Sequence, residues 1–137
     1  MSLKAAWQAQ QTAAGGFSPY GGLNEFTVSL LVVIGAAQAV ADQLNDTALV
    51  SAAKDATGNG AYKFTFISQT PPKLRGVSAV LYSATLASYS FNVIDTDMNP
   101  GQGIGGTYIT IQFIDKADTA LALPQGTVVV ANFTFGD

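Results

Sequence analysis

The chain has 137 residues, a length typical of one domain with its own core. It contains no histidine and no cysteine, which excludes a catalytic histidine, disulfide bonds and thiolate metal sites. Six basic and nine acidic side chains give a net charge of -3, which argues against nucleic acid as a partner, because phosphate binding depends on clustered Lys and Arg.

The first 24 residues differ in composition from the rest. Ala, Gln and Gly dominate, and two Gly pairs bracket the segment Phe17–Tyr20. Residues 4–14 contain good helix formers and predict a short helix, although their apolar residues form no wide stripe. We interpret residues 1–24 as an arm with Trp7, Phe17, Pro19 and Tyr20 as anchors on a neighbouring subunit. The alternative is a frayed terminus.

From residue 25 onward, β-branched and aromatic residues recur in short runs between Gly, Pro, Asn and Asp. Strands are expected at residues 26–34, 47–54, 61–68, 76–83, 87–94, 107–114 and 127–135, and residues 36–43 are ambiguous between strand and helix. The first run is mostly apolar and predicts a strand buried on both faces. The last is expected to be paired inside a sheet. This pattern predicts an all-β fold, an antiparallel β-sandwich or jelly-roll-like body over residues 25–137 with an N-terminal extended arm.

Alternation within the strands predicts which aromatic residues are buried. Tyr62, Phe64 and Phe66 share one side of their strand, as expected for core residues, and we prefer this interpretation to a carbohydrate-binding platform. Tyrosines with an apolar ring and a polar tip suit interfaces better. The candidates are Tyr20, Tyr82, Tyr89 and Tyr108.

The surface is expected to be poor in charge. Hydrophobic residues make up 48% of the chain and charged residues 11%, well below the ~25% usual in soluble domains. Such a surface favours association, so we expect a homo-oligomer. The chain start has no signal-peptide pattern, and residues 26–41 are too short and too interrupted for a membrane helix. The expectation is therefore a soluble protein synthesised in a cytoplasm, with no membrane partner.

Two glycine- and aspartate-rich motifs match binding loops only in part. Residues 101–106 have the letters of a dinucleotide fingerprint, but a strand pattern follows where a helix is needed. Residues 95–99 begin like a calcium loop, yet Pro100 occupies the position that needs glycine. We expect Asp95 and Asp97 to cap a turn. A single weak ion there is the alternative.

The sequence carries no positive signal for catalysis. The only glutamate, Glu25, stands at the edge of the arm, and no nucleophile motif is present. We expect a non-enzymatic protein without catalytic, cofactor-binding or metal-ligating residues. A carboxylate-type enzyme is the third-ranked alternative.

The stretch Gly58–Phe66, with its Gly-x-Gly-x-Tyr-x-aromatic pattern, resembles a hairpin in virion proteins of tailed bacteriophages. Residues 123–130, which lead into the final strand, resemble the close of the same proteins. The resemblance covers roughly residues 47–137. It implies a capsid decoration (cement) protein on the capsid exterior, a homotrimer that bridges subunits of the major capsid protein. The alternative is a trimeric tail-fibre or head-fibre knob that binds a host receptor or glycan.

Overall fold

The computed structural model describes Trp7, Ala9 and residues 25–67, 73–86, 88–97 and 107–136. The elements are β1 (Glu25–Ile34), the 3-10 turn η1 (Ala36–Gln38), β2 (Val40–Asn45), β3 (Val50–Lys54), β4 (Ala61–Phe66), β5 (Lys73–Tyr82), β6 (Ser90–Asp97), β7 (Thr107–Ile114) and β8 (Val128–Gly136). Nearly all described residues of regular structure are therefore in strands. The predicted all-β fold is confirmed.

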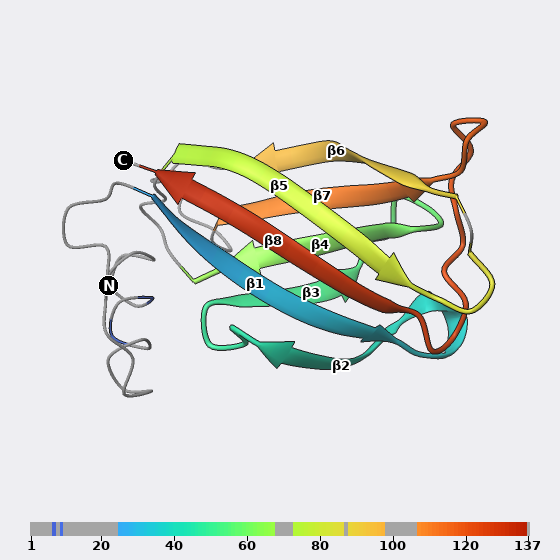
Figure 1. Cartoon of the computed structure of the whole chain (residues 1–137), viewed down its shortest axis with the longest axis horizontal. Coiled ribbons are helices and arrows are strands. Elements are labelled where there is room, and N and C mark those ends of the chain that lie inside the picture. The colour runs from blue at the N-terminus through green and yellow to red at the C-terminus, as the bar shows by residue number, and fades with distance from the viewer. Residues whose placement is uncertain are drawn as a thin grey trace.

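The strands form two antiparallel sheets that pack face to face as a β-sandwich (Figure 1). Sheet A has the order β2-β1-β8-β5, and sheet B has the order β3-β4-β7-β6. The chain crosses between the sheets after β2, β4, β5 and β7. β8 lies in the interior of sheet A, between β1 and β5, as expected for the last strand.

The core lies between the two sheets and is rich in aromatic rings. Phe133 on β8 contacts Phe64 and Phe66 on β4, with both pairs of ring centroids 5.1 Å apart. Tyr62 is also buried, so the predicted inward face of β4 is confirmed. Aromatic rings of this size remove much apolar surface from water, and tilted or edge-on pairs add a further attraction.

The prediction that β1 is buried on both faces is wrong. Its even-numbered residues from Phe26 to Ile34 are buried, whereas Thr27 is exposed and Ser29, Leu31 and Val33 are half-buried. β1 lies in an antiparallel sheet with one face on the core, and a strand in that position alternates. Its outward residues happen to be apolar, which conceals the alternation in the sequence.

The ambiguous segment 36–43 resolves into η1 and the first part of β2. Ala37 and Gln38 have positive φ angles of 55° and 63°, so the chain reverses sharply between β1 and β2. The Gln38 carbonyl oxygen accepts a hydrogen bond from the Tyr62 hydroxyl at 2.8 Å, and its Oε1 accepts from the Gly60 N–H at 3.0 Å. Gln38 thereby ties the β1–β2 turn to the β3–β4 loop.

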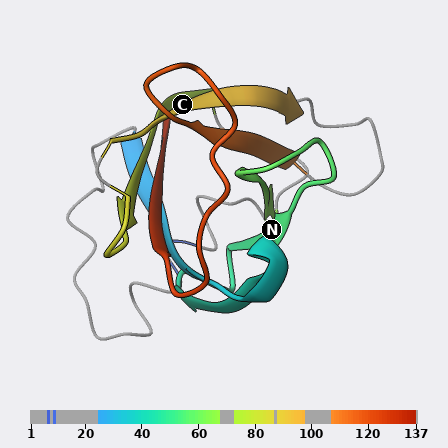
Figure 2. The same cartoon turned by 90° about the vertical axis from the view of Figure 1, so that its right-hand side faces the viewer.

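The connection between β7 and β8 covers the same end of the sandwich. Figure 2 views this end, with the connection crossing in front of the sheets and η1 to the right of its lower part. The Leu121 N–H donates to the Phe113 carbonyl oxygen at 3.0 Å, the Gly126 N–H donates to the Ile34 carbonyl oxygen at 2.8 Å, and Leu123 is buried. Buried apolar groups and paired backbone make this end a closed part of the fold.

Candidate interaction surface

Side chains that commonly bind metals are scarce in this protein. The chain has no His or Cys, and the part that the structure describes holds no group of three or more acidic side chains able to bind a metal. Within the same residues, no helix has the length and apolarity required to cross a membrane.

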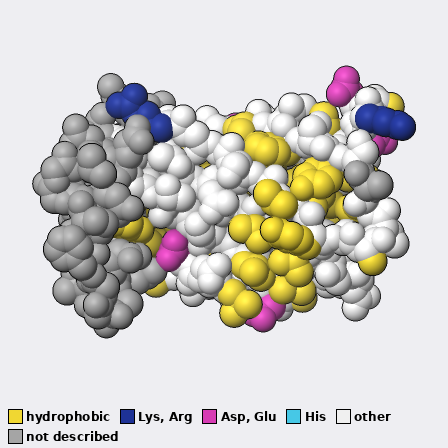
Figure 3. All heavy atoms as spheres, in the orientation of Figure 1, with side chains coloured by type: hydrophobic (Ala, Val, Ile, Leu, Met, Phe, Trp, Pro, Cys, Tyr) yellow, Lys and Arg dark blue, Asp and Glu magenta, His cyan; other side chains and the backbone are white. Residues whose placement is uncertain are grey.

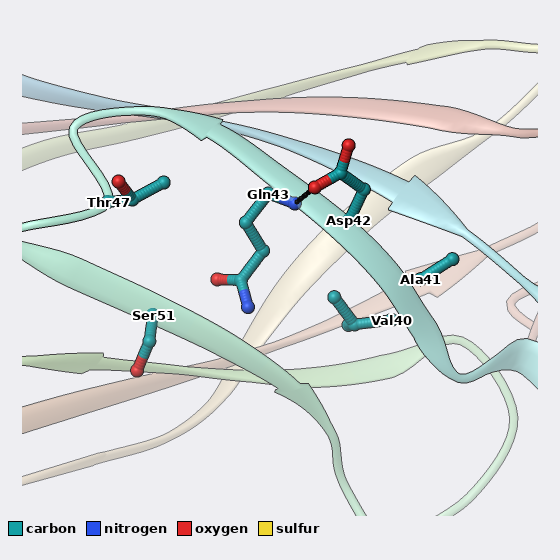
Figure 4. Close-up of a pocket in the computed structure, with 6 residues that line it drawn as sticks. All are labelled: Val40, Ala41, Asp42, Gln43, Thr47 and Ser51. Carbon is teal, nitrogen blue, oxygen red and sulfur yellow. Dashed lines mark hydrogen bonds between the residues drawn. The ribbon is translucent and has the colours of Figure 1, made fainter.

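A shallow, open groove runs between the edge strands β2 and β3 (Figure 4). Its lining residues are Val40, Ala41, Asp42, Gln43, Thr47 and Ser51. The Gln43 side chain extends towards β3, where its Oε1 accepts the Ala52 backbone N–H at 2.7 Å. The Asp42 carboxylate accepts the Gln43 N–H at 2.8 Å and points to the other side of β2. The Gln43 side chain therefore occupies a backbone donor on the edge of β3. The residues that line the groove include no acid–base pair.

The outer face of sheet A carries an apolar patch at the end near η1. Outward-facing residues from all four strands of the sheet meet there. They are Leu31, Val33, Leu44, Val80, Tyr82, Val128 and Val130, which we call the apolar patch. Leu44 is 49% exposed, Val80 40% and Tyr82 61%, and the residues between them are half-buried. Figure 3 shows these hydrophobic side chains gathered on the face towards the viewer.

The other half of this face is polar and its groups are paired with one another. Ser29 Oγ donates to Asn132 Oδ1, and the Asn132 amide donates to Ser78 Oγ at 3.5 Å. The Thr27 and Thr134 hydroxyls lie 3.1 Å apart and share a hydrogen bond. Polar groups that already have partners are less costly to remove from water. Both halves of the face are therefore suited to being covered.

The outer face of sheet B combines charged side chains with an aromatic ring. Lys63 Nζ lies 4.0 Å above the centroid of the Tyr108 ring, and the Tyr108 hydroxyl donates to Asp95 Oδ2 at 3.1 Å. This hydrogen bond to Asp95 raises the pKa of Tyr108 above its ordinary value, with smaller contributions from desolvation and nearby carboxylates. The arrangement is exposed, and a cation–π contact at such a site is worth about 0.5–1 kcal/mol.

The prediction that Asp95 and Asp97 cap a turn is wrong, because both lie in β6. Asp97 pairs with Tyr108 in the register, and Asp95 pairs with Thr110 after a bulge. Charged residues on an exposed edge strand discourage pairing with another chain, which accounts for them without a ligand. Asn99 and the glycine-rich segment 101–106 lie outside the described residues.

The predicted interface residues fall in different places. Tyr82 belongs to the apolar patch, and Tyr108 is half-buried on the opposite face of the sandwich. Trp7 is 7% exposed and packs on Phe26 of its own chain, with ring centroids 5.6 Å apart. Phe17, Pro19 and Tyr20 lie outside the described residues.

Tyr89 is not a free surface residue. Its ring packs against the core, and its hydroxyl accepts the Leu81 backbone N–H at 2.9 Å.

The sequence analysis also missed the aliphatic members of the apolar patch, such as Leu44 and Val80. Period-two spacing gave a signal that these residues share one side of their strands, but it does not say which side faces water.

Comparison with protein-family models, with curated proteins and with solved structures finds no match for this chain.

Proposed function

We propose that this chain is a non-enzymatic structural protein of a tailed-phage particle, a capsid decoration protein on the outer surface of the shell. It stabilises the shell by bridging subunits of the major capsid protein. The observation that carries the proposal is the outer face of sheet A, a broad sheet surface that is apolar at one end and internally hydrogen-bonded at the other. Such a surface suits protein contacts that persist.

The resemblance to phage virion proteins supports the same function. The stretch Gly58–Phe66 comprises the end of the β3–β4 loop and β4, and residues 123–130 comprise the end of the β7–β8 connection and the start of β8. The glycine-rich loop and residues 123–126 therefore both belong to the closed end of the sandwich.

The mechanism in this proposal is mechanical. A subunit that spans two capsid proteins adds its interface free energy to the work needed to separate them. Each interface of standard size removes on the order of 1,600 Å² from water, and many copies act together. The N-terminal segment, residues 1–24, supplies further contacts in this account through Phe17, Pro19 and Tyr20.

A tail-fibre or head-fibre knob is the second candidate. The observation that favours it is the charged and aromatic outer face of sheet B, where Lys63, Tyr108 and Asp95 present hydrogen-bonding groups beside an aromatic ring. Glycan sites combine such groups. A knob binds through this face in isolation, whereas a decoration protein has no need to.

The copy number of the chain in purified phage particles separates the two candidates. Quantitative mass spectrometry against the major capsid protein is expected to give hundreds of copies per particle. A handful of copies, together with glycan binding that K63A and Y108F abolish, supports the knob. Absence of the chain from the particle contradicts both.

A further inference from the structure

The outward residues of sheet A repeat the same chemical types on either side of its midline. The midline runs between β1 and β8, with β2 outside β1 and β5 outside β8. One row across the sheet reads Leu44, Leu31, Val130, Val80. The next reads Asp42, Val33, Val128, Tyr82. Apart from Asp42 and Tyr82, an acceptor and a donor, every position has an aliphatic counterpart at equal distance from the midline.

We propose that two copies of this chain pair through the outer face of sheet A about a two-fold axis that runs along the strands, between β1 and β8. In such a pair, a residue on one side of the midline faces the partner's residue at the same distance on the other side. The patch must therefore complement itself. This axis sets Leu44 against Val80 of the partner, Leu31 against Val130, and Val33 against Val128. The inference rests on the face itself, and it differs from the homotrimer that the phage resemblance implies. Because the proposed capsid contacts use the same face, a pair in solution must dissociate before a subunit binds the shell through it.

Charge supports this axis. The carboxylate of Asp42 meets the Tyr82 hydroxyl of the partner, which is a donor and is well exposed. The two Asp42 residues of a pair stand about 14 Å apart, three strand spacings of ~4.8 Å, which exceeds the screening length at physiological salt. A two-fold axis that crosses the strands at the middle of the face would instead lay the apolar patch on the Ser29, Asn132 and Ser78 row.

The size of the face predicts the strength of the pairing. Strands β1, β8 and β5 have nine paired residues each and β2 has five, so spacings of ~4.8 Å between strands and ~3.4 Å between residues give a footprint of about 500 Å² per copy. A standard stable interface buries ~800 Å² per partner, and about 1,000 Å² in total is the usual minimum for a specific one. The face is at the small end for specific interfaces, where weak pairs are typical, so we expect a dissociation constant in the micromolar range.

The test is sedimentation equilibrium of the full chain between about 1 and 500 µM, a range that brackets micromolar dissociation constants. We expect a monomer–dimer equilibrium in the intact chain. The single variants L44E and V80K each raise the dissociation constant about tenfold or more, because each places a charge against an aliphatic side chain at both symmetric positions. The double variant L44E/V80K recovers most of the loss, because each new carboxylate then meets a new ammonium group of the partner.

The matched control is Ile67, which is 52% exposed and lies beyond the end of β4 in sheet B. I67E and I67K should leave the equilibrium unchanged. Circular dichroism and thermal unfolding of every variant establish that it folds, as expected for substitutions at exposed positions. A chain that stays monomeric over the whole range overturns the proposal. So does a trimer, or a dimer in which L44E/V80K associates no better than the single variants.

These outcomes are distinct from those of the proposed function. A chain that pairs as described but is missing from phage particles retains the interface and loses the capsid role. A chain that is abundant in particles but monomeric in solution retains the capsid role and loses the paired interface.

Discussion

The Tyr89 hydroxyl accepts the Leu81 backbone N–H at 2.9 Å, and so occupies a donor on the open edge of β5. Gln43 does the same for β3, where its side chain accepts the Ala52 N–H. Unpaired donors on a sheet edge are templates for pairing with other chains. On one edge of each sheet, a side chain therefore occupies a backbone donor that could otherwise pair with another chain.

Y89F is expected to lower the free energy of unfolding by about 1–2 kcal/mol, because the buried Leu81 N–H loses its partner while the ring stays. Urea unfolding followed by fluorescence measures the change. Y82F, at an exposed position, is the matched control and should be nearly neutral for folding. Equal losses in both variants would show that the Tyr89 hydroxyl contributes nothing to the edge.

G60A should be the most destabilising of three glycine substitutions. Gly60 has a φ of +69°, and a Cβ there would overlap the Leu121 carbonyl oxygen and stand 2.9 Å from that of Phe113. Backbone strain and overpacking each cost about 1–3 kcal/mol. G126A meets open space at a φ of +91° and should cost only the strain, and G76A should be nearly neutral. Thermal unfolding that ranks G60A no worse than G126A would contradict the close approach of the β7–β8 connection.

Stability is expected to fall between pH 10 and pH 12 through Tyr62. Burial raises the pKa of Tyr62 from 10.0 to about 12. In that window the unfolded chain has released this proton and the folded chain has kept it, so the unfolding free energy decreases as pH rises. Below pH 10 the contribution is fully present.

Y62F tests this contribution. At neutral pH it should cost about 1 kcal/mol, the value of the lost hydrogen bond to the Gln38 carbonyl oxygen. The difference from the intact chain should shrink as pH rises from 10 to 12. Denaturant unfolding at a series of pH values measures it. A constant difference across the window would mean that Tyr62 does not keep its proton in the fold.

W7A is expected to destabilise the body by about 1–3 kcal/mol, because it uncovers Phe26 and the Phe135 ring stacked beneath it. W7F keeps an aromatic ring at the site and should recover most of the loss. Differential scanning calorimetry measures both. An unchanged transition in W7A would support the interpretation of residues 1–24 as an arm that contributes little to folding.

The sequence predicts the positions of the strands well and their environment less well. Tyr62, Phe64 and Phe66 alternate with polar residues, so both their strand and their buried side follow from the pattern. β1 is apolar on both sides, and only the structure shows that Leu31 and Val33 face outward. The local sequence does not predict the outward direction of these two side chains, because that direction depends on which face of the strand the other sheet covers.

The conformations of the turns are harder to predict from the sequence than the strands. Ala37 and Gln38 adopt positive φ without being glycine, because hydrogen bonds from Tyr62 and Gly60, both distant in the sequence, hold the turn. The apolar patch likewise joins residues from four strands through pairing between β1 and β8, which lie about 100 residues apart. The spacing of residues within one strand therefore does not predict a patch that is assembled from four strands.

The proposed capsid role is tested by an electron cryomicroscopy map of particles that contain this chain. If the proposal holds, we expect density for the β-sandwich in many symmetric copies on the outer surface of the shell, each in contact with more than one major capsid subunit. Density confined to the tail or to fibres, or a shell whose outer surface carries no copy of this chain, would contradict it.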